Sequence, residues 1–143
     1  MSPPAPLPLP FEFTVRGLPV SHQSRNKKLL AAWRQQVRGA AAGLWGTAPP
    51  VGVALRIAVT YFHDDADPRI DADNMLKPIQ DALNGLVYED DRLILDAQVR
   101  KARIDEPIRA RHGSLPLLHA FHVGEPFVHV IIDLAPSHSD PLR

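Results

Sequence analysis

Residues 51–62 have the sequence VGVALRIAVTYF, and this stretch decides the fold. Every second side chain is apolar and large, which is typical of a strand with one face in a core. The alternating side chains are Val53, Leu55, Ile57, Val59 and Tyr61. Similar alternation predicts further strands at residues 11–15, 93–99 and 127–134.

Two segments between these strands have helical periodicity. In residues 27–45 the apolar residues recur at spacings of three and four, which predicts a helix with one buried face. A second helix is expected to begin near Lys77, because Pro78 fits only the first turn, and to end at Asn84 and Gly85. Residues 105–126 show no clean period and are expected to form a long loop.

The order of these elements predicts an α+β fold. We expect a small single domain over residues 11–143, with a mixed β-sheet of about four strands and two helices packed on it. Residues 1–10 contain five prolines and form a lead-in that need not be ordered.

Composition narrows the classes of function. The chain has 143 residues, no cysteine and a net charge of zero, which excludes disulfides, thiol nucleophiles and a general basic coat for nucleic acid. No apolar run approaches the roughly 18 residues of a membrane helix. We therefore expect a cytoplasmic protein with no membrane partner.

The charge is unevenly distributed along the chain. Residues 1–60 hold seven basic residues and one acidic residue, whereas residues 61–96 hold three basic and ten acidic residues. A basic segment beside clustered carboxylates suits the binding of an anionic ligand through divalent metal ions, because the cations would cancel the repulsion between the carboxylates. A solvated acidic loop is the alternative that composition alone favours.

Residues 71–91 carry the candidate chemistry. Asp71 and Asp73 bracket one residue at a helix entry, Lys77 follows four positions later, and Asp90 and Asp91 come after the helix. Magnesium prefers hard oxygen ligands such as carboxylates. An EF-hand loop is excluded because the positions that require Gly and Glu hold other residues, and no phosphate-binding glycine loop occurs.

The motif Asp71-Ala-Asp73-Asn74-x-x-Lys77-Pro78, followed by Asp81-Ala-Leu83-Asn84-Gly85 and by Asp90-Asp91, resembles the RusA family of Holliday-junction endonucleases. The dense part of the match covers residues 71–99. The resemblance implies a small homodimer that depends on Mg²⁺, or on Mn²⁺ in its place, and cuts branched DNA such as a four-way junction. The loop at residues 105–126 is longer than expected for the family.

The resemblance also implies residue roles. Asp71, Asp73 and Asp91 correspond to the metal-binding carboxylates, Lys77 to the essential lysine, and Asp90 to an adjacent acid of second rank. We expect the three carboxylates to converge on one site. Asp81 and Asn84 are interpreted as a hydrogen-bonding face that supports this site.

Phosphate contacts are expected from a basic group at the first helix, although a solvated helix start would look the same. Its members are Arg25, Lys27 and Lys28, with Arg34 or Arg38. Two other functions stay open, a nucleic-acid-binding accessory protein that no longer cuts and a metal nuclease acting on flap DNA or RNA. The intact set of acids and lysine favours an enzyme, because a binding protein does not need clustered acids that repel phosphate.

Overall fold

The computed structural model describes residues 7–64, 68–105 and 114–136, and it confirms the α+β fold. Four strands form one mixed sheet in the order β1-β4-β2-β3. The strands are β1 (Phe11–Arg16), β2 (Leu55–His63), β3 (Ile94–Arg103) and β4 (Phe127–Leu134). β4 pairs antiparallel with both β1 and β2, whereas β2 and β3 are parallel. A parallel pair needs a crossover connection, and the helix α2 (Ala72–Leu83) lies within it.

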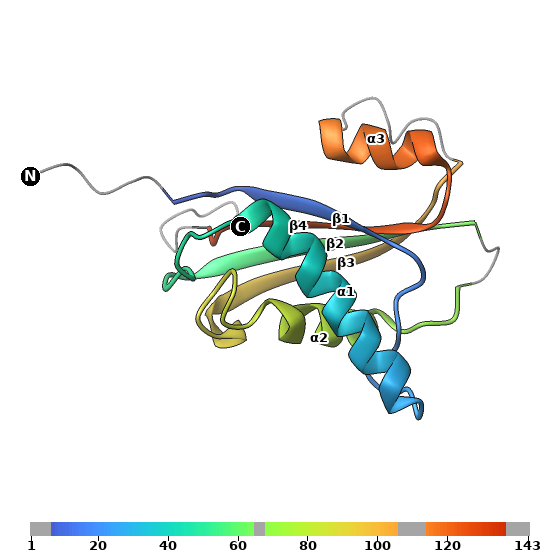
Figure 1. Cartoon of the computed structure of the whole chain (residues 1–143), viewed down its shortest axis with the longest axis horizontal. Helices are drawn as coiled ribbons and strands as arrows, with labels where there is room; N and C mark the ends of the chain where they lie inside the picture. The colour runs from blue at the N-terminus through green and yellow to red at the C-terminus, as the bar shows by residue number, and fades with distance from the viewer. Residues whose placement is uncertain (1–6, 65–67, 106–113, 137–143) are drawn as a thin grey trace, which may run out of the picture.

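The helices lie on both faces of this sheet (Figure 1). The 19-residue helix α1 (Lys27–Trp45) and α2 share one face and enclose the main core with the alternating side chains of β2, such as Ile57 and Val59. A third helix, α3 (Leu115–Val123), packs on a smaller apolar cluster that includes Phe62. Neighbouring side chains of a strand point to opposite faces of the sheet, so β2 contributes side chains to both apolar clusters.

The predicted bounds of α1 are confirmed. Asn26 caps the helix by accepting a 3.0 Å hydrogen bond from the Leu29 N–H. Gly46 ends it with a φ of 72°, a conformation that glycine adopts at no steric cost.

Two strand boundaries differ from the predicted ones. β2 begins at Leu55, because Val51 pairs instead with the turn after α2, donating from its N–H to the Val87 carbonyl (2.8 Å). The third strand runs to Arg103 and is preceded by a short 3-10 helix, η1 (Asp91–Leu93).

The prediction of one long loop at residues 105–126 is wrong, because it contains α3. This helix has apolar residues on all sides and buries only Ala120, so no periodic stripe marks it in the sequence. Ser114 caps it, and the adjacent Pro116 falls in the first turn, where proline is tolerated. Residues 106–113 lie outside the described part of the chain, as do residues 1–6 of the predicted lead-in.

The expected start of the second helix is also wrong. α2 begins at Ala72, and Pro78 lies inside it. Proline has no N–H to offer the carbonyl four residues earlier, that of Asn74. The backbone N–H of His22 donates to this carbonyl instead, at 2.8 Å, so the helix continues through the proline.

Candidate active site

Asp71 and Asp73 stand exposed at the N-terminal end of α2. Asp71 occupies the capping position, yet its carboxylate does not bond to the helix backbone. It accepts only a long hydrogen bond of 3.4 Å from the Asn74 side chain, and Asp73 has no polar partner among the described residues. Both carboxylates are therefore available to a ligand.

Lys101 holds the chain that leads into this acidic end. Its ammonium group, on β3, donates to the carbonyl of Ile70 at 2.9 Å and lies 3.4 Å from that of Pro68. The contact fixes the backbone directly before Asp71. The sequence gives no signal for this role of Lys101, because the alternation of a strand does not indicate which loop a side chain will reach.

A tight turn after α2 brings Asp91 back to the helix. Gly85 adopts a φ of 76° and its N–H donates to the Tyr88 carbonyl at 2.8 Å. The buried Tyr88 hydroxyl donates to the Gln80 carbonyl at 2.7 Å. Burial raises the pKa of Tyr88 far above its ordinary 10.0, so the hydroxyl remains a donor at every pH of interest.

Lys77 lies between two carboxylates. Its Nζ is 3.0 Å from Asp81 Oδ1 and 3.2 Å from Asp91 Oδ2. These partners, Asp81 first, raise the pKa of Lys77 above its ordinary 10.5 although partial burial opposes them. The structure thus brings together Lys77 and Asp91, residues 14 positions apart, and keeps the lysine charged.

Asn84 joins the same group from the end of α2. Its side-chain nitrogen donates to Asp91 Oδ2 at 3.3 Å, which agrees with the supporting role expected for this residue. Arg34, on α1, lies 3.9 Å from Asp81. Arg38, one turn further along α1, directs its guanidinium at the backbone carbonyls of Ala82 and Asn84, each 2.9 Å away. Both arginines therefore face α2.

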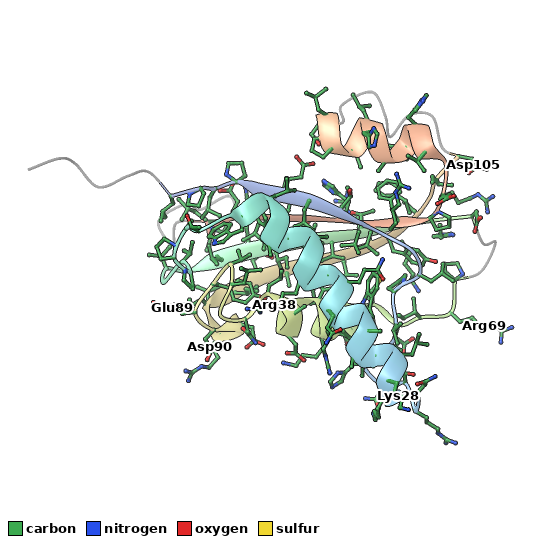
Figure 2. All side chains as sticks on the ribbon, viewed as in Figure 1. Lys28, Arg38, Arg69, Glu89, Asp90 and Asp105 are labelled. Atoms are coloured by element: carbon green, nitrogen blue, oxygen red, sulfur yellow. The ribbon has the colours of Figure 1, made fainter. Side chains whose placement is uncertain are left out.

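Asp90 makes a different contact from that of Asp91. It caps η1 by accepting from the Arg92 N–H at 2.9 Å, and this bond lowers the pKa of Asp90. In Figure 2 Asp90 lies in the turn that follows α2, at the left of the molecule. Its carboxylate already satisfies a backbone donor.

Arg25, Lys27 and Lys28 are exposed where α1 begins, and Lys28 projects from the lower end of this helix in Figure 2. The first turn of α1 contains no acidic residue. Two lysines at the positive end of a helix dipole repel it, so they are poorly placed for helix stability and well placed to attract an anion.

No three His, Asp or Glu side chains within residues 7–64, 68–105 and 114–136 form a group that could hold a metal ion. The structure therefore does not bring Asp71, Asp73 and Asp91 together as such a group, and their shared binding of one metal ion stays a prediction. The donors themselves are carboxylate oxygens, the ligands that Mg²⁺ prefers, and Mg²⁺ keeps several waters and needs only one or two of them. The chemistry of these side chains fits a hydrated divalent ion.

The family model described as endodeoxyribonuclease RusA matches residues 16–111. The chain belongs to the RusA family. The match spans α1, α2 and the acidic turn, and it assigns the chain to endodeoxyribonucleases that act on Holliday junctions.

No curated protein sequence matches the chain significantly. Within the described residues, no helix is long and apolar enough to cross a membrane.

Proposed function

We propose that this RusA-family protein is a Mg²⁺-dependent endonuclease, with Mn²⁺ as a substitute, that resolves four-way DNA junctions in recombination and repair in the cytoplasm. The observation that carries the proposal is the contact of Lys77 with Asp91, because it joins the two ends of the acidic motif. A purely structural ion pair would not explain why Asp71 and Asp73 stand exposed six and four positions before the lysine.

Asp71, Asp73 and Asp91 would hold the metal, with Asp90 as a further candidate. When bound, Mg²⁺ would neutralise phosphate charge and activate a water for attack on phosphorus. Lys77 presents a positive charge to the scissile phosphate, whose negative charge is stabilised as the transition state forms. Asp81 keeps this ammonium oriented through its 3.0 Å contact.

The DNA backbone is proposed to contact Arg25, Lys27 and Lys28. The hydrogen bond from His22 to Asn74 fixes the loop before α1 on the first turn of α2, so the basic residues and the acidic motif belong to one surface. Local positive charge is needed there because the chain as a whole is neutral. Arg34 and Arg38 face α2 and are not included in this group.

A homodimer is proposed because a four-way junction has two strands to cut symmetrically, which two protomers related by a twofold axis can reach. β3 offers a surface for such an association. Among the described strands it pairs with β2 alone, and its residue Leu95 is 59% exposed. An edge strand of ten residues is a template for pairing with another chain.

Cleavage assays on a synthetic four-way junction, a flap and a linear duplex, each with Mg²⁺ or with a chelator, test this function. We expect paired cuts in the junction that require Mg²⁺. Binding without cutting would favour the accessory protein. Preferential cutting of the flap would favour the other class of nuclease.

A further inference from the structure

The carboxylate of Asp91 accepts hydrogen bonds from two side chains, Lys77 and Asn84. Lys77 and Asn84 both donate to the same oxygen, Oδ2, at 3.2 and 3.3 Å. Two donors from different directions on one oxygen fix the plane of the carboxylate, and with it the direction of Oδ1. Asn84 and Lys77 together therefore orient the Asp91 carboxylate toward a ligand.

Asn84 is itself fixed by α1. The helix α2 has no basic residue in its last turn, and its final carbonyls would otherwise need another donor. One nitrogen of Arg38 supplies both missing bonds, to Ala82 and to Asn84, at 2.9 Å each. A guanidinium at this end also complements the negative pole of the helix.

The Asn84 amide has little freedom in this arrangement. Its Oδ1 is buried and has no partner among the described residues. A flip of the amide would place this oxygen against Asp91 Oδ2, and two hydrogen-bond acceptors would then face each other. The amide thus keeps its N–H group on Asp91, and the bond from Arg38 to the Asn84 carbonyl holds the backbone from which this amide projects. A donor that orients a metal-binding carboxylate affects metal affinity about 10- to 100-fold in other proteins.

We infer that Asn84, anchored by Arg38, is a positioning residue that sets the orientation of Asp91 for the divalent metal. This inference rests on the proposed nuclease function and assigns Arg38 to the metal site rather than to phosphate contact. Arg38 acts at a distance, through the backbone of residue 84, and touches no reacting atom.

The test compares Asn84→Ala, Arg38→Ala and Arg38→Lys with the wild-type protein. Asn84→Ala keeps the carbonyl that Arg38 binds, so it removes the amide alone and preserves the end of α2. Three quantities are measured: Mg²⁺ affinity without DNA by calorimetry, the Mg²⁺ concentration that gives half-maximal junction cleavage, and junction affinity in a chelator at several salt concentrations. Ser114→Ala, which removes a helix-capping side chain on the other face of the sheet, is the matched control for lost stability.

We expect both alanine variants to bind Mg²⁺ about 10- to 100-fold more weakly, with a similar rise in the half-maximal concentration. Arg38→Lys should recover part of this loss, because an ammonium can still donate to the two carbonyls. Junction affinity and its salt dependence should stay unchanged in all variants, and Ser114→Ala should keep the wild-type response to Mg²⁺.

Two results would overturn the inference while leaving the nuclease function intact. One is unchanged Mg²⁺ affinity in Asn84→Ala. The other is a weaker junction affinity in Arg38→Ala, with a salt dependence reduced by about one unit of slope, which would make Arg38 a phosphate contact. A wild-type protein that neither binds Mg²⁺ nor cuts the junction would overturn both proposals.

Discussion

The backbone N–H of His22 donates to the carbonyl of Asn74 at 2.8 Å, and this carbonyl is the one that Pro78 leaves without a helical partner. A single hydrogen bond thus repairs the interruption of α2 and docks the loop that leads to the basic start of α1. Pro78 therefore leaves free the carbonyl through which the loop before α1 binds to α2, and so it helps to bring the basic start of α1 to the acidic motif.

Replacing His22 by proline should remove this bond. Because the Asn74 carbonyl would lose its donor, we expect His22→Pro to lower the free energy of unfolding by about 1 kcal/mol or more. Junction affinity should also fall, since the basic loop would no longer be fixed on α2. Urea denaturation and a binding titration measure both effects.

His22→Ala is the control for this substitution, because it removes the imidazole and retains the N–H. It should change stability by only about 0.5 kcal/mol. Equal losses in the two variants would show that the side chain, and not the backbone bond, is responsible.

The Tyr88 hydroxyl should contribute to stability through the Gln80 carbonyl. Tyr88→Phe leaves this partly buried carbonyl of α2 without its 2.7 Å donor, so we expect a loss of about 1–2 kcal/mol in the free energy of unfolding. Chemical denaturation of the two proteins at neutral pH gives the difference. A Tyr88→Phe variant as stable as the wild type would mean that the hydrogen bond contributes nothing to the turn.

The ion pairs of Lys77 should give stability an alkaline dependence. The pKa of Lys77 is raised above 10.5 in the folded protein, so its contribution is fully present below that pH and is lost as the pH rises through the raised value. We expect the difference in unfolding free energy between wild type and Lys77→Met to be constant from about pH 7 to 10 and to shrink above it. A difference that stayed constant through the alkaline range would argue against these pairs.

Much of the fold could be predicted because local patterns carry it. The strands at β1 and β4 and the helix α1 each have a clear period and clear end signals, such as Asn26 and Gly46. The helix α3 lacks a polar face, and the carbonyl that Pro78 leaves without a donor inside α2 accepts from His22, far away in sequence. Sequence periodicity contains neither kind of information.

In the candidate site, too, some features follow from local sequence patterns and others depend on contacts between distant segments. The spacing of Asp71, Asp73 and Lys77 follows from one helix, and the resemblance to RusA supplied Asp91. The contacts of Lys101 and Arg38 with backbone carbonyls depend on how β3 and α1 pack against the chain around α2. A carbonyl partner leaves no signature in the sequence, so the sequence alone does not show that Arg38 contacts the end of α2.

The lysines of α1 should govern the electrostatic part of DNA binding. Replacing Lys27 and Lys28 together by alanine should weaken junction binding on any sequence and reduce the salt dependence by about two units of slope, since each phosphate contact releases roughly 0.9 counterion. Binding titrations at several salt concentrations measure the slope. An unchanged slope would show that the phosphates are contacted elsewhere.

The most direct test of the catalytic role of the Asp91 carboxylate is junction cleavage by Asp91→Asn in Mg²⁺, together with junction binding in a chelator. Asparagine has the same shape and can still accept from Lys77 and Asn84, so the fold is preserved while the negative charge is lost. The proposed mechanism predicts that cleavage falls by at least about 100-fold while junction affinity stays near that of the wild type. Wild-type cleavage by Asp91→Asn would contradict it.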